Sequence, residues 1–370
     1  MTGKELHYIS EAHFNGKLAG DGPFTDKCHQ WLENKTTAHK VLLTHSCTSA
    51  LEMTALLLGI REGDEIIMPS YTFVSTANAF VMRGAVPVFV DIRPDTLNID
   101  ESLIESAITC KTKAIVPVHY AGVSCEMDKI MKIATKHQLF VVEDAAQGIM
   151  SSFKGRALGS IGHFGTYSFH ETKNVISGEG GALIINDQKY SYKAEVIREK
   201  GTDRSRFLRG EVDKYTWQNS GSSFLPGELI AAFLWAQLQE AESITKQRLA
   251  SWYYYHELLV ELEERKLLRR PIVPEHCEHN AHMYYILLND ASQRDLVLSQ
   301  LKANNIHAVF HYIPLHNSPA GKKFGRTNGT MVNTEQLTEQ IIRLPLWVGI
   351  SKLQQEMVVK VLSNVLSELV

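Results

Sequence analysis

Residues 168–181 read SFHETKNVISGEGG, and this stretch decides how the middle of the chain folds. It joins two short apolar runs, GTYSF at 165–169 and ALIIN at 182–186, which lie too close together for a crossover helix. We therefore expect the two runs to pair directly as strands, with Lys173 in the loop between them. A lone loop lysine is ordinarily a solvated surface residue, unless the rest of the sequence supplies partners for chemistry.

Upstream of this stretch, β-branched runs alternate with helical patterns. We expect strands at EIIMP (65–69), VPVFVD (86–91), KAIVPVH (113–119) and LFVVED (139–144), and helices at 49–59, 75–83, 101–108 and 126–137. Strand–helix–strand alternation at this spacing predicts a parallel sheet with helices on both faces. Such sheets bind ligands at the carboxyl ends of their strands.

Downstream, a long helical stretch at 227–267 leads into a second α/β unit. Its predicted elements are a strand at 282–289, a helix at 293–303, a strand at 307–313 (HAVFHYI) and a final helix at 352–368. We therefore predict a large domain over residues 1–245, with a mostly parallel sheet, and a smaller C-terminal α/β domain over residues 246–370.

Composition restricts the function classes. The net charge of −3 gives no broad electrostatic surface for nucleic acid or an anionic membrane. The five cysteines are widely spaced with no C-x-x-C pair, which argues against a disulfide scaffold or a zinc ribbon and fits a reducing cytosol. The N-terminal MTGKELHYIS has no signal-peptide core, and no run has the length of a membrane span. We expect a cytoplasmic protein without a metal centre.

The run LFVVEDAAQG at 139–148 ends a buried strand with a carboxylate, Asp144. A carboxylate at the end of a central strand is costly unless it has a partner. A protonated pyridine nitrogen would be such a partner, and the pair would strengthen the ring as an electron sink. Asp is also a favoured helix N-cap, and the residues leave both interpretations open.

Three further signals point to a ligand. SCTSA at 46–50 opens a helix whose N-terminus could hold a phosphate, with Ser168 as a donor from the opposite side, although plain capping is the simpler interpretation. Phe73, in PSYTFVST at 69–76, could stack on a flat ring or pack in the core. The glycines of GEGG allow backbone to pass close to a ligand, and the dinucleotide pattern G-x-G-x-x-G is absent there.

Together these signals describe one ligand. A lysine whose pKa is lowered can form a Schiff base with an aldehyde. The aldehyde, a phosphate, a flat ring and a ring nitrogen are the parts of pyridoxal 5′-phosphate, which we predict as the cofactor.

The motif S-F-x-x-x-K-x-x-x-x-G-E-G-G is present without a gap, and with it the chain resembles the DegT/DnrJ/StrS family of nucleotide-sugar aminotransferases. The resemblance covers essentially the whole chain and includes the strings SCTSALEM, PSYTFVSTANAF, PVHYAG, VVEDAAQG and FHYIPLH. It implies an aspartate-aminotransferase-like fold, the pyridoxal-phosphate fold type I.

The resemblance also implies roles for individual residues. Lys173 would bind the cofactor covalently and then carry the proton between cofactor and sugar. Asp144 would pair with the pyridinium nitrogen, Phe73 would stack on the ring, and Gln147 would lie against it near the phenolic oxygen. The phosphate would be held by Thr48, Ser49 and Ser168.

The resemblance is weaker at the residues that would contact the substrate. His316, in the P-L-H string, resembles a residue near the sugar pocket. Ser223 stands where many relatives carry an Asn that reaches the partner subunit's cofactor phosphate. The segment 198–210 lies just before the turn at Ser223, and the arginine fork can donate two parallel hydrogen bonds to a phosphate. We therefore predict that this segment, and Arg209 in particular, binds the nucleotide diphosphate. The alternative is a solvated basic loop. Relatives usually begin with an extended I-P-F-x-x-P segment, whereas Met1 follows its position, so we expect part of the substrate entrance to differ.

The implied reaction moves the amino group of L-glutamate to C4 of a dTDP-4-keto-6-deoxyhexose, for cell-surface polysaccharide synthesis, in a homodimer with sites at the interface. A sugar dehydratase on the same fold carries His in place of Lys173. A non-catalytic, sugar-sensing regulator could lose Lys173 or Asp144, and this chain keeps both.

Overall fold

The computed structural model describes residues 1–369, and its largest element is an eight-stranded sheet. The strand order is β1-β9-β8-β5-β4-β2-β3-β13. β9 runs antiparallel to β1 and β8, and the other neighbours pair in parallel. The strands are β1 (Lys40–Thr44), β2 (Glu65–Pro69), β3 (Val86–Val90), β4 (Thr112–Ile115), β5 (Phe140–Asp144), β8 (Phe164–Ser168), β9 (Gly181–Ile185) and β13 (Arg326–Thr327). The predicted α/β class, and the direct pairing of β8 with β9, are confirmed.

Helices cover both faces of this sheet because its strands are buried on both sides. Val41 and Leu43 pack toward α1, α2, α6 and α9, whereas Leu42 between them packs toward α3, α4 and α7. These helices are α1 (Glu5–Phe14), α2 (Pro23–Thr36), α3 (Cys47–Leu57), α4 (Val74–Val81), α6 (Met127–His137), α7 (Ser191–Arg198) and α9 (Glu228–Gln239). Within residues 1–369, no helix is both long enough and apolar enough to cross a membrane.

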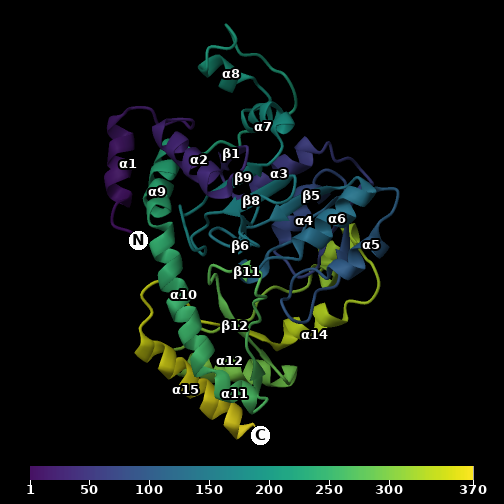
Figure 1. Ribbon diagram of the computed structural model, residues 1–370, viewed down its shortest axis with the longest axis vertical. Helices are drawn as coiled ribbons and strands as arrows, with labels where there is room; N and C mark the ends of the chain where they lie inside the picture. The colour runs from purple at the N-terminus through teal and green to yellow at the C-terminus, as the bar shows by residue number, and fades with distance from the viewer. Residues whose placement is uncertain (370) are drawn as a thin grey trace.

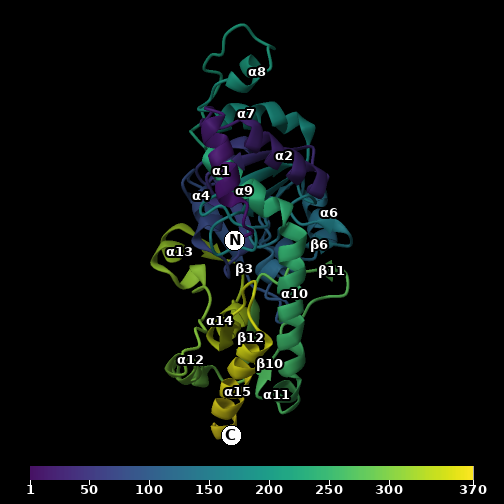
Figure 2. The same ribbon diagram turned by 90° about the vertical axis from the view of Figure 1, so that its left-hand side faces the viewer.

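The helix α10 (Ala241–Leu258) runs down the molecule and joins the large sheet region to a smaller one (Figures 1 and 2). The smaller region holds an antiparallel sheet in the order β10-β12-β14, against which α10, α11, α12 and α15 pack. Its elements are β10 (Leu268–Arg269), β12 (Tyr284–Leu288), β14 (Ile341–Leu344), α11 (Val260–Glu264), α12 (Arg294–Ala303), α14 (Val332–Gln340) and α15 (Lys352–Glu368).

The C-terminal part of the chain returns once to the large sheet. After α13 (Pro319–Phe324), the two-residue strand β13 pairs in parallel with β3 and forms the edge of the large sheet. An ion pair of 2.9 Å between Arg326 and Glu65 supports this contact. The division of the chain at residue 245 stays a prediction.

The other elements are short. A small sheet in the order β11-β6-β7 uses β6 (Ser152–Phe153), β7 (Arg156–Ala157) and β11 (Cys277–Glu278). The remaining helices are α5 (Ile104–Ala107), α8 (Arg204–Leu208) and the single 3₁₀ turns η1 (Glu101–Leu103), η2 (Tyr120–Gly122), η3 (Gln188–Tyr190), η4 (Ala291–Gln293) and η5 (Leu315–Asn317).

The predicted strand at 307–313 is wrong. Only Val309 pairs there, through an isolated bridge in which it exchanges backbone hydrogen bonds with Arg343. The following His311 and Tyr312 line a cavity, and Pro314 has no N–H to continue a ladder. The alternating pattern of residues 307–313 therefore belongs to a segment of the cavity wall and not to a strand of a sheet.

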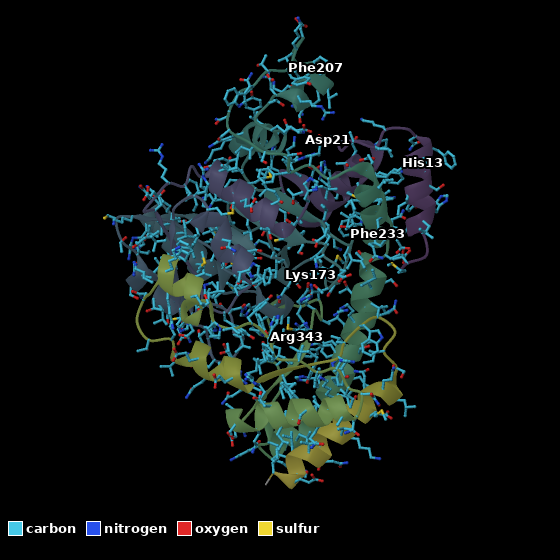
Figure 3. The ribbon with its side chains drawn as sticks, turned by 180° about the vertical axis from the view of Figure 1, so that it is seen from behind. His13, Asp21, Lys173, Phe207, Phe233 and Arg343 are labelled. Atoms are coloured by element: carbon cyan, nitrogen blue, oxygen red, sulfur yellow. The ribbon has the colours of Figure 1, made fainter. Side chains whose placement is uncertain are left out.

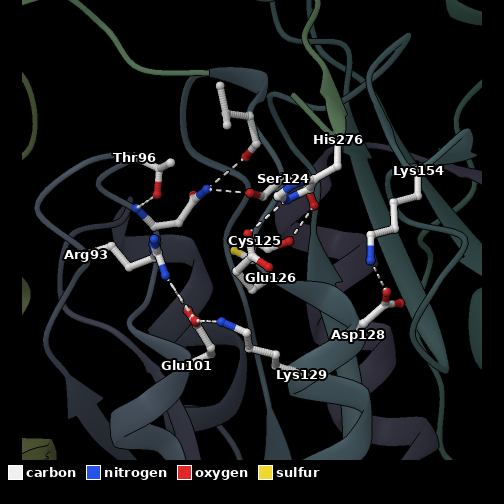
Figure 4. Close-up of polar contacts among 12 residues, drawn as sticks. Arg93, Thr96, Glu101, Ser124, Cys125, Glu126, Asp128, Lys129, Lys154 and His276 are labelled. Atoms are coloured by element: carbon white, nitrogen blue, oxygen red, sulfur yellow. Dashed lines mark hydrogen bonds and ion pairs between the residues drawn. The ribbon is translucent and has the colours of Figure 1, made fainter. Parts of the chain in front are cut away.

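A polar network fixes the loop at residues 119–125 (Figure 4). The Asn98 side-chain amide donates to two backbone carbonyls of the 119–125 loop, at 3.0 and 2.9 Å, and its oxygen accepts from a backbone N–H of the same loop at 2.9 Å. Next to it, Arg93 and Lys129 both pair with the buried Glu101. These contacts fix the position of the loop, and its Ala121 N–H in turn donates to the side chain of Gln147.

Candidate active site

A cavity of about 600 Å³ opens where the parallel strands of the large sheet end. Six of the residues singled out from the sequence line it together: Thr48, Phe73, Asp144, Gln147, Ser168 and Lys173. They follow four different strands, whose carboxyl ends meet at one edge because those strands are parallel. The site therefore lies where the sequence pattern predicted a ligand.

Lys173 lies in the loop between β8 and β9, and its neighbours hold that loop firmly. Its backbone N–H donates to the carbonyl of His170 at 2.9 Å. The next side chain, Asn174, donates to the backbone carbonyl of Asn280 at 2.8 Å, and its oxygen lies 3.1 Å from Nδ1 of His282. These bonds tie the lysine loop to the segment that leads into the smaller sheet.

The environment of Lys173 favours its neutral amine. Burial lowers the pKa of Lys173 below its usual 10.5, and the positive charge of Arg343 acts in the same direction. Cys47 and Asp144 oppose this shift. A neutral amine is the form that attacks an aldehyde, so the lysine is suited to covalent chemistry.

The glycine turn after Lys173 allows a close backbone approach. A Cβ on Gly181 would lie 2.3 Å from the carbonyl carbon of Ser46 and 2.4 Å from the nitrogen of Cys47. Gly178 has a φ of 81°, which L side chains rarely adopt. The GEGG turn therefore brings β9 directly against the start of α3.

The neighbouring carboxylates of Glu143 and Asp144 serve different purposes. Glu143 points into the fold, where it accepts three backbone hydrogen bonds from the 159–162 turn and lies 2.9 Å from Nε2 of His119. Asp144 lines the cavity and accepts from the Thr76 hydroxyl at 2.7 Å. No helix begins directly after Asp144, so it is not a helix N-cap, although its Oδ1 accepts from the backbone N–H of Ala146 at 3.2 Å. Because a carboxylate can accept further hydrogen bonds, Asp144 could still face a cationic ring nitrogen.

The N-terminus of α3 opens into the cavity. Ser46 is its N-cap and accepts from the backbone N–H of Ser49 at 3.1 Å. Ser49 contacts the hydroxyl of Ser46 and does not line the cavity, whereas Thr48 does and bonds to the hydroxyl of Ser75 at 2.7 Å. A helix N-terminus with hydroxyl groups beside it is suited to a phosphate.

Phe73 and Gln147 also lie on the cavity wall. Phe73 is 55% exposed, so it is not a core residue. Gln147 is held at both ends of its amide, since it accepts from the N–H of Ala121 at 2.7 Å and donates to the hydroxyl of Tyr312 at 3.1 Å. Ala121 belongs to the loop that the Asn98 network fixes.

The residues present fit pyridoxal phosphate. The α3 N-terminus with Thr48 and Ser168 would hold the phosphate, Asp144 the ring nitrogen, and Lys173 the aldehyde. This arrangement puts hydroxyl and backbone donors at the phosphate and a carboxylate at the ring nitrogen, and a second carboxylate, that of Glu179, also lines the cavity. The roles of these residues stay predictions.

Besides Ser49, three predicted residues do not line the cavity of their own chain. His316 lies 2.7 Å from the Ser70 hydroxyl through Nδ1 and 3.2 Å from Glu335 through Nε2. Ser223 is exposed and bridges to Glu199 through its backbone. Arg209 is the third.

The arginines of segment 198–210 are all paired within the chain. Arg209 contacts Glu195 at 2.9 Å and Glu211 at 2.6 Å. The other pairs are Arg198 with Asp21, Arg204 with Glu199, and Arg206 with Glu211. The segment with α8 projects from the rest of the molecule (Figure 1).

The structure adds cavity residues that the sequence analysis missed. Among them are Thr76, His282, His311, Tyr312 and Arg343, and the last four come from the C-terminal part of the chain. Figure 3 shows Lys173 and Arg343 in the central part of the molecule, between the two sheet regions. The string FHYIPLH contained a signal for His311 and Tyr312, whereas Arg343 had none.

The family model of the DegT/DnrJ/EryC1/StrS aminotransferases matches residues 1–363. GDP-perosamine synthase of Caulobacter vibrioides is 32% identical, over 86% of this chain and 84% of that protein. UDP-4-amino-4-deoxy-L-arabinose–oxoglutarate aminotransferase of Shewanella sediminis is 31% identical, over 93% and 91%. The crystal structure of a DegT DnrJ EryC1 StrS aminotransferase from Brucella abortus superposes with a TM-score of 0.89 at 28% identity, covering 98% of this chain and 95% of that one.

Proposed function

The chain belongs to the DegT/DnrJ/EryC1/StrS aminotransferase family and is a pyridoxal-phosphate-dependent sugar aminotransferase, and from this premise we propose that it transfers the amino group of L-glutamate to C4 of dTDP-4-keto-6-deoxy-D-glucose. The products are dTDP-4-amino-4,6-dideoxy-D-galactose and 2-oxoglutarate. The amino sugar would then enter cell-surface polysaccharides, such as enterobacterial common antigen or the O-antigen of lipopolysaccharide.

One observation carries the catalytic part of this proposal: a single cavity brings together Lys173, Asp144 and the α3 N-terminus. The choice of sugar is supported by sequence strings. GKLAGDGPFT, GSSFLPGELIAAFLWAQL and FHYIPLH look close to the dTDP-4-amino-4,6-dideoxygalactose transaminase of enterobacterial surface-glycan synthesis.

The chain's own residues would divide the work as follows. Pyridoxal phosphate supplies an aldehyde and a ring that accepts electrons when a C–H bond breaks. Lys173 would provide the amine for the aldehyde, and its Nζ would carry the proton between the reacting carbons. Asp144 would keep the ring nitrogen protonated, and Gln147 and Phe73 would position the ring.

We propose that the protein is a homodimer with sites at the interface. Tyr215 and Trp217, in the projecting segment, are 50% and 82% exposed, which is typical of residues that a partner covers. In such a dimer Ser223 would reach the partner subunit's phosphate, and Arg209 and His316 would contact the sugar nucleotide. The cytoplasmic location is part of the same proposal, and all five cysteines are free thiols.

A second candidate is an aminotransferase for another nucleotide-linked 4-keto-sugar. It is favoured by the relatives named for a GDP-sugar and a UDP-sugar at 32% and 31% identity. The regulator alternative is disfavoured because a protein without catalysis has no need to keep both Lys173 and Asp144 in one cavity.

The test is to incubate the purified protein with dTDP-4-keto-6-deoxyglucose and ¹⁵N-labelled L-glutamate and to identify the product by NMR. We expect ¹⁵N at C4 with the galactose configuration, together with 2-oxoglutarate. An amine at another carbon, the glucose configuration, or turnover only with a GDP- or UDP-linked ketone would reject the proposed substrate and leave the second candidate.

A further inference from the structure

Ala121 has a strained backbone conformation in the loop at residues 119–125. Its φ is 57° and its ψ is 15°, in the left-handed region, and it is buried. A Cβ makes this conformation unfavourable, so alanine adopts it only where neighbouring contacts hold it there. Strain of this kind is often found beside functional sites, where the surrounding structure maintains it.

The Ala121 N–H fixes which end of the Gln147 amide faces the cavity. It donates to the Gln147 side chain at 2.7 Å, and because a backbone N–H is only a donor, the atom that accepts must be the oxygen Oε1. The nitrogen Nε2 therefore lies on the other side of the amide, where one of its two hydrogens reaches the Tyr312 hydroxyl at 3.1 Å. Within residues 1–369 the second hydrogen meets no other acceptor, and Gln147 lines the cavity, so this N–H is available to a ligand bound there.

The backbone of Gln147 is held separately from its side chain. The fully buried Asn280 donates from its amide to the backbone carbonyls of Gln147 and Ile149, each at 2.7 Å. The loop packs directly against Asn280, because a Cβ on Gly122 would lie 2.1 Å from the Asn280 Oδ1. With its main chain fixed, Gln147 keeps only the rotation of its side chain, and the Ala121 N–H restricts that rotation.

Asn98 holds the loop on both sides of Ala121. Its Oδ1 accepts from the backbone N–H of Tyr120, directly before Ala121, at 2.9 Å. Its Nδ2 donates to the carbonyls of Val123 and Ser124, which follow Ala121, at 3.0 and 2.9 Å. Both amide hydrogens are thus used, and Asn98 is 1% exposed. Because a relaxation of Ala121 to a usual φ would turn the peptide groups that Asn98 holds, these three bonds oppose it.

The same loop reaches a second cavity residue. The Tyr120 hydroxyl lies 2.8 Å from Nδ1 of His311, which lines the cavity, and 3.0 Å from the hydroxyl of Tyr71. A variant that displaces the loop can therefore act through Gln147 or through His311.

We propose that Asn98 is a positioning residue for amino transfer: by holding Ala121 in its left-handed conformation, it keeps the Gln147 amide turned so that an N–H faces the cofactor. This inference rests on the proposed function, since it requires the phenolic oxygen of pyridoxal phosphate to lie beside Gln147. There the N–H would stabilise negative charge on that oxygen, whereas a flipped amide would present its own oxygen and repel the charge.

The first experiment compares the absorbance spectrum of the bound cofactor, at one pH, in the wild type, Asn98→Ala, Gln147→Leu and the double variant. Asn186→Ala is the control, because the Asn186 amide also donates to two backbone carbonyls, those of Gly159 and Gly162, but does not line the cavity. We expect Asn98→Ala to shift the spectrum in the same direction as Gln147→Leu, and the double variant to match Gln147→Leu. Asn186→Ala should keep the wild-type spectrum even where it lowers the melting temperature, because a loss of stability alone leaves the cofactor's surroundings unchanged.

The half-reaction with L-glutamate measures the size of the effect. We expect its maximal rate to fall roughly 10- to 100-fold in Asn98→Ala, as for displacement of a group that orients the reacting molecule. In the Gln147→Leu background, Asn98→Ala should cause a further loss of less than about twofold, because the contact that Asn98 supports is already absent. Asn98→Ser keeps a hydroxyl at this position and should lie between the wild type and Asn98→Ala, and it takes the place of Asn98→Ala if that variant does not fold.

A measurement on the cofactor-free protein completes the test without chemistry. Hydrogen exchange in the peptide that covers residues 119–125 should be faster in Asn98→Ala than in the wild type or in Asn186→Ala, because the bonds that hold the loop are lost.

Three results would overturn the inference. The first is unchanged hydrogen exchange of the loop in Asn98→Ala, and the second is a wild-type cofactor spectrum and half-reaction in that variant. The third is a pair of losses, from Asn98→Ala and Gln147→Leu, that multiply in the double variant, because Asn98 would then act through His311 or another residue. If the wild type binds the cofactor but does not react with L-glutamate, the proposed function fails instead, and the cofactor spectra and hydrogen exchange decide the role of Asn98.

Discussion

The two walls of the cavity differ in how the protein satisfies their polar groups. On the large-domain wall, Asp144 accepts from Thr76 and Gln147 is bonded at both ends. On the small-domain wall, His311 and Tyr312 are also hydrogen-bonded, but the Arg343 guanidinium forms no hydrogen bond or ion pair within residues 1–369. Side chains that are already hydrogen-bonded to the protein have fixed orientations, so they suit a cofactor that stays bound in one position. A charged side chain without a protein partner suits a ligand that enters and leaves. We therefore expect the large-domain wall to serve the resident cofactor and the small-domain wall to serve the exchanging substrates.

The largest effect should come from the large-domain wall, at Lys173. Lys173→Ala removes both the amine that binds the aldehyde and the group that carries the proton. We expect overall transamination to fall by roughly 10⁴-fold or more, with circular dichroism unchanged. Lys154→Ala, a surface lysine paired with Asp128, is the control. Residual turnover within tenfold of the wild type would show that another group does this chemistry.

Asp144→Asn should have the next largest effect. A neutral amide no longer favours a protonated ring nitrogen, so the ring accepts electrons less well. We expect cofactor to stay bound while both half-reactions slow by roughly 10²- to 10³-fold, the loss typical of removing one electrostatic partner. If only one half-reaction slowed, Asp144 would contact a substrate rather than the cofactor, and the proposed difference between the two walls would be wrong.

Arg209→Ala tests the projecting segment and should have a smaller effect. To bind a diphosphate, this guanidinium must give up contacts to Glu195 and Glu211, so the net gain is reduced. We expect the half-saturating keto-sugar concentration to rise by at most about tenfold, with the glutamate half-reaction unchanged. Identical keto-sugar curves for variant and wild type would make this segment a surface loop.

The smallest effect concerns the stability of the cofactor-free protein. Because burial lowers the pKa of Lys173, the unfolded state binds more protons than the folded state between the lowered pKa and the usual 10.5. Stability therefore rises with pH through that window, and the buried charge costs stability below it. Lys173→Met should be more stable than the wild type at pH 7, and the difference should shrink as pH rises. A difference in urea unfolding midpoint between Lys173→Met and the wild type that does not change with pH would contradict the lowered pKa.

The sequence predicted the large-domain wall well because its residues directly follow strands. Asp144 and Ser168 end their strands, and a β-branched run followed by a polar residue at a sheet edge is a local pattern. The SFHETK…GEGG loop gave Lys173 in the same way. Parallel pairing then brings such local signals together without further information.

The small-domain wall could not be predicted in the same way. Arg343 lies in the string EQIIRLPL, which reads as an ordinary buried strand. Its position at the cavity depends on its register with Tyr285 and on how the small sheet packs against the large one, and neither is visible in a local pattern. The mistaken strand at 307–313 has the same cause, because His311 and Tyr312 are shaped by a cavity formed with distant residues.

The most direct test of the account is to trap the covalent link at the site. The holoenzyme is reduced with borohydride, which fixes pyridoxal phosphate to the lysine that holds it, and is then digested and mapped by mass spectrometry. We predict one modified peptide, carrying the phosphopyridoxyl group on Lys173, and no modification when excess L-glutamate is added before reduction. Stoichiometric labelling of any other lysine would contradict the assignment of this cavity as the catalytic site.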